Sequence, residues 1–93
     1  MRRKCFLCGR LETDYLGLER HHIFGGANRQ LSEKYGLTVM LCHNCHNEPP
    51  RGAHYNKETA DYLHRYGQEK AMREQGWDKQ MFISIFGRNY LDI

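Results

Sequence analysis

Two pairs of cysteines with the spacing C-x-x-C constrain the fold of this chain more than any other feature of its sequence. The first pair is Cys5 and Cys8, and the second is Cys42 and Cys45. Tetrahedral zinc binds four thiolates or imidazoles at roughly 2.0–2.3 Å, and this spacing presents two thiolates from one turn of the chain. We therefore expect the four cysteines to form a structural zinc site, and residues 9–41 between the pairs to form a hairpin of their own.

Disulfides are the alternative use of four cysteines in a chain of 93 residues. A domain of this size is near the lower limit for a single hydrophobic core, and it often needs a metal or disulfides as a staple. No apolar stretch has the length of a signal peptide or a membrane helix, so we expect a cytoplasmic protein with no membrane partner. Thiols persist as metal ligands in a reducing cytoplasm, which favours zinc over two disulfides.

The segment from Cys42 to His46 also has the pattern C-x-x-C-H of c-type haem attachment. Haem attachment takes place outside the cytoplasm, and it leaves Cys5 and Cys8 without a role, so zinc is favoured here too. Iron bound by the four thiolates, as in an electron carrier, is a further alternative, and such a protein would be coloured.

The hydropathy pattern predicts a small α+β domain over residues 1–93, with a metal-binding core over 5–54 and a helical extension over 55–93. The predicted elements are, in chain order, a strand over 16–23, a polar loop over 24–36 with one helical turn begun at Ser32, a strand over 37–41, a short helix through His46 and Asn47 that Pro49-Pro50 ends, a helix over 57–75 capped by Asn56 and closed by Gly76, and a helix over 78–86 closed by Gly87.

Six histidines in this chain indicate a second metal site. His21 and His22 lie on the first predicted strand, where neighbouring side chains point to opposite faces. The side chains expected on one face are those of Leu18, Arg20 and His22, and those expected on the other are Glu19, His21 and Ile23. The two histidines can share one site only at a distorted strand end, which Gly25-Gly26 permits.

A neutral imidazole, with a pKa near ~6.5, either binds metal or takes a proton from water. Zinc at the four cysteines would hold His46 in front of a second metal that faces His21 and His22. Plainer roles are expected of His43, as a hydrogen-bond donor beside the zinc ligands, and of His64, as an ordinary residue of the long helix.

The order of these motifs resembles that of HNH endonucleases, which have the ββα-metal (His-Me finger) fold. The resemblance covers residues 5–47, about half the chain, and its motifs are Cys5-x-x-Cys8, His21-His22-Ile23 and Leu41-Cys42-x-x-Cys45-His46-Asn47. The run His22-Ile-Phe-Gly-Gly-Ala-Asn-Arg and the later Gly-Ala-His54 are also similar to phage recombination-enhancement nucleases that depend on RecA. The implied partners are DNA and either a recombinase filament or phage recombination and packaging proteins.

The resemblance implies a role for each histidine of the second site. His21 and His46 would bind a catalytic divalent metal such as Mg²⁺, Mn²⁺ or Ni²⁺. His22 would be the general base that activates water for attack on phosphorus. Asn47 and His54 are further candidates for metal ligands or phosphate contacts.

One position departs from the pattern of the family. The middle asparagine of the HNH motif falls at Leu37, whose side chain cannot make the hydrogen bonds that orient the catalytic loop. The main chain of Gly36 and the side chain of Asn28 are the candidates for this role.

The formal net charge of +3 is concentrated in the half of the chain that contains the cysteines. Residues 1–51 carry eight Lys and Arg against five Asp and Glu, whereas residues 52–93 carry six of each kind. Zinc bound by four thiolates has a charge of about −2, so these basic residues either compensate the site or bind phosphates. The candidate phosphate contacts are Arg20, Arg29, Lys34 and Arg51. If they bind DNA without chemistry, the chain is a non-catalytic zinc-binding nucleic-acid-binding module, which is the alternative to a nuclease.

Overall fold

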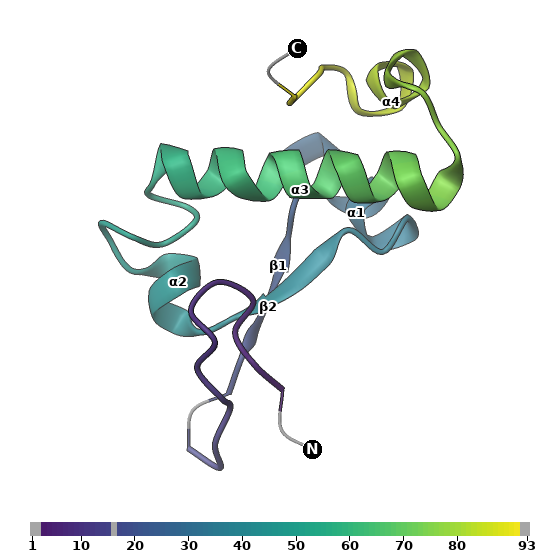
Figure 1. The fold of residues 1–93 in the computed structure, drawn as a ribbon. Coiled ribbons are helices and arrows are strands. Elements are labelled where there is room, and N and C mark those ends of the chain that lie inside the picture. The colour runs from purple at the N-terminus through teal and green to yellow at the C-terminus, as the bar shows by residue number, and fades with distance from the viewer. Residues whose placement is uncertain (1–2, 16, 92–93) are drawn as a thin grey trace. The chain divides into compact units, whose positions relative to one another are not determined.

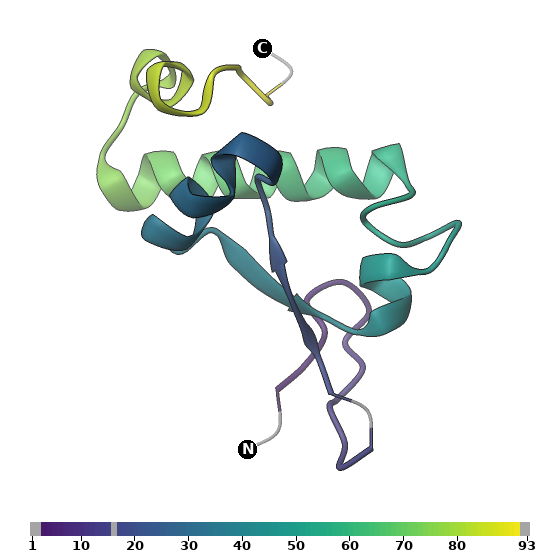
Figure 2. The same ribbon diagram turned by 180° about the vertical axis from the view of Figure 1, so that it is seen from behind.

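The chain folds into two strands and several helices, and the computed structural model describes residues 3–15 and 17–91. The elements are, in chain order, β1 (Glu19–His22), η1 (Gly26–Asn28), α1 (Arg29–Lys34), β2 (Thr38–Leu41), α2 (His43–Asn47), α3 (Lys57–Gln75) and α4 (Lys79–Phe86). β1 and β2 pair in a two-stranded sheet and lie side by side in both ribbon views (Figure 1, Figure 2). The predicted α+β class is therefore confirmed.

Contacts between Cα atoms divide the chain into two units, each built from two separate segments of sequence. Unit 1 contains Met1–His21 and Thr38–Ala60, and unit 2 contains His22–Leu37 and Asp61–Ile93. The division falls inside β1, between its last two residues. The two neighbouring histidines of this strand therefore belong to different units.

Unit 1 begins with a tight hairpin that carries the first C-x-x-C pair. Lys4 and Leu11 form an antiparallel bridge, and the amide of Cys5 donates to the carbonyl of Arg10 at 2.8 Å. Gly9 follows the second cysteine of the pair and has a φ of 77°, a left-handed conformation that favours glycine. This turn brings the two thiols of the pair to the same side of the hairpin.

The second C-x-x-C pair lies at the start of α2, close after β2. Cys42 precedes the helix in an extended conformation, and its carbonyl accepts a hydrogen bond from the amide of His46 at 3.0 Å. The helix ends at Asn47, because Glu48 is already extended and two prolines follow it. The predicted short helix is therefore observed.

A tight turn after α2 brings the chain back to the helix. The amide of Ala53 donates to the carbonyl of Cys45 at 2.7 Å. The amide of His54 donates to the carbonyl of His46 at 3.3 Å. Gly52 is required in this turn, because a Cβ there would lie 2.8 Å from the main-chain nitrogen of the residue that follows α2. The turn therefore places His54 beside His46.

Phe24 lies at the centre of an aromatic cluster in unit 2. Four rings have their centroids 4.9–5.7 Å from that of Phe24, and they belong to His64, Phe82, Phe86 and Tyr90. Gly67 lets α3 approach this cluster, since a Cβ at that position would lie 2.6 Å from Ile23 and 2.9 Å from Phe24. Both Ile23 and Phe24 are only 1% exposed, so they form part of the core of this unit.

The segment between the strands is more regular than the sequence predicts. A polar loop over 24–36 with one helical turn begun at Ser32 is the expectation, whereas η1 and α1 occupy most of the segment (Figure 2). Ser32 lies inside α1 and is fully buried, because its hydroxyl bonds to the main chain of Phe24. The first strand is also shorter than predicted, since β1 covers only Glu19–His22 of the predicted range 16–23, and Leu16 lies outside the described residues.

The two long helices begin and end within one residue of their predicted limits. The side chain of Asn56 accepts a hydrogen bond from the amide of Thr59 at 2.9 Å, which caps α3. Gly76 and Gly87 follow the helices with φ of 71° and 95°, as expected of glycines that end a helix. Asp78 is the N-cap of α4 rather than its first residue, because its side chain accepts a main-chain N–H of the first turn. In the part of the chain that the structure describes, no helix has both the length and the apolar character to cross a membrane.

Candidate metal centres

The four cysteines converge in unit 1 and form the four-cysteine cluster, which consists of Cys5, Cys8, Cys42 and Cys45. Their Sγ atoms all lie within 4.8 Å of one another, and all four thiols are free. The Sγ atoms of Cys8 and Cys42 are 3.7 Å apart. A tetrahedral zinc ion with Zn–S bonds of ~2.3 Å separates its sulfurs by roughly 3.8 Å. The cluster could therefore hold a zinc ion.

The thiols of Cys5 and Cys45 differ in how readily they ionise. Burial opposes the ionisation of Cys5, but main-chain N–H groups facing its sulfur outweigh burial and lower the pKa of the thiol to about 6; they belong to Cys8, Cys42 and Leu7. Burial raises the pKa of the Cys45 thiol, and the neighbouring thiols raise it further. Ionisation of Cys45 therefore needs a cation at the site, as expected of a ligand whose deprotonation accompanies metal binding.

Two arginines border the four-cysteine cluster. A pocket beside the thiols is lined by Cys8, Arg10, Cys42, Asn44, Cys45 and Arg51. Zinc with four thiolates carries a charge of about −2, so Arg10 and Arg51 lie where a positive charge stabilises the site. Arg51 is thus placed to compensate the cluster, in addition to its expected role as a phosphate contact.

Three histidines form a second group in unit 1, the three-histidine cluster. His21 comes from β1, His46 from α2 and His54 from the turn after α2, and one ring nitrogen of each lies within 4.8 Å of the others. The Nε2 atoms of His46 and His54 are 3.0 Å apart. The ring centroids are 4.7–5.2 Å apart, so three imidazoles converge on a small volume that could hold a metal ion.

The lowered pKa of His54 fits a cation site. Burial lowers the pKa of His54, and the charge of protonated His46 lowers it further. His21 is only 7% exposed. Neutral imidazoles are the form that binds metal, and a cation between their lone pairs removes the repulsion that their close approach would cause.

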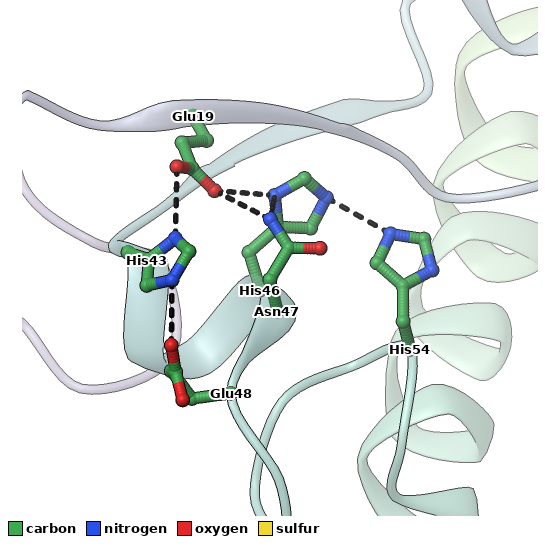
Figure 3. Close-up of polar contacts among 6 residues, drawn as sticks. All are labelled: Glu19, His43, His46, Asn47, Glu48 and His54. Carbon is green, nitrogen blue, oxygen red and sulfur yellow. Dashed lines mark hydrogen bonds and ion pairs between the residues drawn. The ribbon is translucent and has the colours of Figure 1, made fainter.

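Glu19 joins this cluster to the rest of α2 (Figure 3). Its Oε1 atom is 2.8 Å from Nδ1 of His46 and 2.9 Å from Nδ2 of Asn47. Its Oε2 atom is 3.1 Å from Nδ1 of His43, whose Nε2 atom is 2.7 Å from Oε1 of Glu48. The hydrogen bond from His46, followed by that from His43, lowers the pKa of Glu19. Hydrogen bonds to both carboxylates raise the pKa of His43.

Glu19 has no role in the sequence-based prediction, although a signal for it exists. Side chains two residues apart on a strand lie on the same face, and Glu19 is two residues before His21. Asn47, a candidate ligand, uses its side-chain amide to donate to Glu19.

His22, the expected general base, is not a member of the three-histidine cluster. It belongs to unit 2, where its Nε2 atom is 2.7 Å from Oε1 of Glu33 on α1. An ionised carboxylate only accepts hydrogen bonds, so Nε2 carries the proton and Nδ1 carries the lone pair. Glu33 is a second residue that the sequence does not single out.

The side chain that orients the chain after His22 is Ser32. Leu37 is fully buried, Asn28 donates to the carbonyl of Phe86 at 2.9 Å, and the carbonyl of Gly36 accepts from Nζ of Lys70 at 3.1 Å. The hydroxyl of Ser32, by contrast, accepts the amide of Phe24 at 3.0 Å and donates to the carbonyl of the same residue at 2.8 Å. The feature that identifies Ser32 is the complete burial of its polar side chain, which the sequence alone does not show.

The four basic residues expected to contact phosphate are all exposed, and they are Arg20, Arg29, Lys34 and Arg51. Arg20 and Arg51 belong to unit 1, whereas Arg29 and Lys34 lie on α1 in unit 2. Lys34 places its Nζ atom 5.3 Å from the centroid of the Tyr35 ring, a cation–π contact.

Comparison of the chain with protein-family models, with curated protein sequences and with solved structures finds no match.

Proposed function

We propose that this chain is a metal-dependent HNH endonuclease that hydrolyses DNA phosphodiester bonds. The observation that carries the proposal is the three-histidine cluster, because three imidazoles leave coordination positions for water and phosphate. Four thiolates form a closed site, which suits a structural ion. The presence of both kinds of cluster in one chain agrees with what the resemblance to HNH endonucleases implies.

In this proposal β1, β2 and α2 form the ββα-metal core. β1 contributes His21 and α2 contributes His46, which are the two ligands that the resemblance implies. His54 is a third ligand, which the tight turn at Gly52 places beside His46.

The ligand set favours some divalent ions over others. Mg²⁺ prefers oxygen ligands in octahedral geometry, whereas imidazoles suit Ni²⁺, Zn²⁺ and, more weakly, Mn²⁺. Of the three expected catalytic ions, Ni²⁺ therefore fits the three-histidine cluster best and Mg²⁺ fits it least.

The chain's own residues then divide the work of hydrolysis. A divalent ion held by the three-histidine cluster would neutralise charge on the phosphate and stabilise the departing oxygen. His22 takes a proton from the attacking water at Nδ1, and general-base assistance of this kind contributes roughly 10²–10⁴-fold to the rate. Oε1 of Glu33 lies 2.7 Å from Nε2 of His22, where it accepts a hydrogen bond and stabilises the imidazolium that forms. The exposed arginines and lysine would bind DNA phosphates with an affinity that falls as salt rises.

A plasmid-nicking assay tests this proposal. Zinc-loaded protein is incubated with supercoiled DNA and Ni²⁺, Mn²⁺ or Mg²⁺, and His22→Ala is compared with wild type. Nicking by wild type that His22→Ala reduces by roughly 10²-fold or more, with zinc content and DNA affinity unchanged, is the expected result.

The alternative is a zinc-binding module that binds nucleic acid without cleaving it. Arg10 and Arg51 beside the four-cysteine cluster are compatible with this role. Wild-type protein that binds DNA but cuts it with none of the three ions would establish the module and exclude the endonuclease.

A further inference from the structure

We infer that Glu19 is a positioning residue for the three-histidine cluster, where it fixes the tautomer and the ring orientation of His46. The inference rests on the proposed metal site, since it concerns how the protein prepares one ligand of that site. It does not depend on whether the bound metal cleaves DNA.

The hydrogen bond between Glu19 and His46 selects one tautomer of the imidazole. Oε1 of Glu19 is 2.8 Å from Nδ1 of His46. Since an ionised carboxylate only accepts hydrogen bonds, this contact places the proton on Nδ1 of the imidazole. Nδ2 of Asn47 lies 3.2 Å from the same Nδ1, but it donates to Oε1 of Glu19 at the shorter distance of 2.9 Å. The lone pair of neutral His46 is then on Nε2, the atom that lies 3.0 Å from Nε2 of His54. Glu19 therefore selects the tautomer whose lone pair points to the other histidines.

The same carboxylate also fixes the rotation of α2. Asn47 donates to Oε1 at 2.9 Å, and Nδ1 of His43 lies 3.1 Å from Oε2. His43, His46 and Asn47 are spaced i, i+3 and i+4, so they share one face of the helix. One side chain of β1 thus binds three donors on that face (Figure 3). Such a contact limits rotation of the helix as well as rotation of the His46 ring.

The contact between Glu19 and His46 also bears on metal affinity. A carboxylate that accepts the second N–H of a metal-binding histidine orients the ring and raises its basicity, and loss of such a partner typically costs 10–100-fold in metal affinity. Glu19 bonds directly to His46, which is a member of the three-histidine cluster. The remaining carboxylate of this network, Glu48, contacts His43.

Glu48 offers a matched control. It accepts a hydrogen bond from Nε2 of His43 at 2.7 Å, so it belongs to the same chain of contacts as Glu19. Its side chain is 52% exposed, compared with 38% for Glu19. Glu48→Gln therefore removes a similar charge from the same network and leaves the contact between Glu19 and His46 in place.

The experiment measures binding of Ni²⁺ by isothermal titration calorimetry to protein whose four-cysteine cluster is already loaded with zinc. The expected result is a dissociation constant about 10–100-fold higher for Glu19→Gln than for wild type, and within about 2-fold of wild type for Glu48→Gln. Circular dichroism and zinc content establish that each variant is folded. Equal affinities of wild type and Glu19→Gln would overturn the inference.

A second measurement uses wild-type protein, so its result does not depend on whether a variant folds. Nitrogen chemical shifts of the His46 ring in zinc-loaded, nickel-free protein report which nitrogen carries the proton. The inference requires the Nδ1–H tautomer, and the Nε2–H tautomer would overturn it. If wild type binds Ni²⁺ through a ring that Glu19 orients but never nicks DNA, the endonuclease proposal fails while this inference stands. Wild type that binds no second ion would overturn both.

Discussion

The hydroxyl of Ser32 binds both main-chain groups of Phe24: it accepts the amide at 3.0 Å and donates to the carbonyl at 2.8 Å. Ser32 is fully buried and Phe24 is 1% exposed, so neither group of Phe24 can turn to water instead. Phe24 follows His22 by two residues. Ser32 therefore fixes the main chain next to His22, which is the task that the resemblance to HNH endonucleases implies for an asparagine.

Ser32→Ala should destabilise the protein strongly for so small a change. The substitution leaves the amide and the carbonyl of Phe24 buried without their partner, and each such group costs about 1–3 kcal/mol. For the two groups together, we expect the free energy of unfolding in urea to fall by roughly 2–6 kcal/mol. Ser84→Ala is the control, because Ser84 is an exposed helical serine that bonds only within its own helix, and it should change stability by less than about 0.5 kcal/mol. A similar effect of both substitutions would contradict the role of Ser32.

Gly67→Ala should also destabilise the protein, although alanine is the better helix former. The gain in helix propensity is about 1 kcal/mol, whereas overpacking a core costs about 1–3 kcal/mol. A Cβ at Gly67 would lie 2.6 Å from Ile23, so the packing cost should win and lower the melting temperature. Gly25→Ala tests the explanation in the same unit, because a Cβ there meets nothing within 4 Å. An increase in stability on Gly67→Ala would show that α3 can move away from the core.

Cys45→Ser and His22→Ala should separate folding from chemistry. Structural zinc contributes about 10–16 kcal/mol in small zinc domains, which is comparable to the total stability of about 5–15 kcal/mol of a whole domain. Cys45→Ser should therefore lose zinc, solubility and helical circular dichroism together. His22→Ala should retain one zinc ion per chain and the wild-type spectrum, and lose nicking activity alone. Unfolding of both variants would contradict the division between a structural and a catalytic site.

His64 should make the stability of the protein depend on pH. Burial is the main cause that lowers the pKa of His64, and the charge of Arg88 lowers it as well. The charge of Asp61 and a main-chain hydrogen bond raise this pKa, but they do not outweigh the lowering. The unfolded chain then binds more protons than the folded chain between the folded pKa and the ordinary value near ~6.5. Stability should be complete above that ordinary value and fall as the pH drops below it.

Urea unfolding at pH 7.5 and 5.5 tests this prediction when wild type is compared with His64→Phe. The phenyl ring can keep the stacked contact with Phe24, whose centroid is 5.4 Å from that of His64. Other groups titrate in this range in both proteins. The contribution of His64 is therefore the difference between wild type and His64→Phe in how much the free energy of unfolding changes from pH 7.5 to 5.5. Identical changes in the two proteins would contradict the prediction.

The elements with local signals could be predicted from the sequence. Asn56 and Gly76 bound α3 as expected, since capping depends on residues adjacent to the helix ends. The C-x-x-C spacing predicts one site for the four cysteines, and their Sγ atoms lie within 4.8 Å of one another in the structure. These features require little knowledge of the rest of the chain.

The remaining features depend on contacts distant in sequence. α1 is short and polar, so its sequence has no apolar repeat at helical spacing that would predict a helix. Its buried Ser32 bonds to a residue eight positions earlier, a contact that depends on the fold. Glu19 meets His46 across 27 positions, and its role becomes visible only when β1 and α2 are placed together. His54 reaches the three-histidine cluster through a turn that depends on the close packing of Gly52.

The shortness of α2 has a consequence for insertions and deletions. The five residues of this helix contain Cys45 of one cluster and His46 of the other, with Cys42 immediately before them. One residue added or removed between Cys42 and His46 would rotate the following side chains by about 100° around the helix axis. The ligands after the change would then no longer point to their own clusters. A point substitution in the three-histidine cluster can alter that site alone, whereas a change in the length of this segment would disable both clusters in a single step.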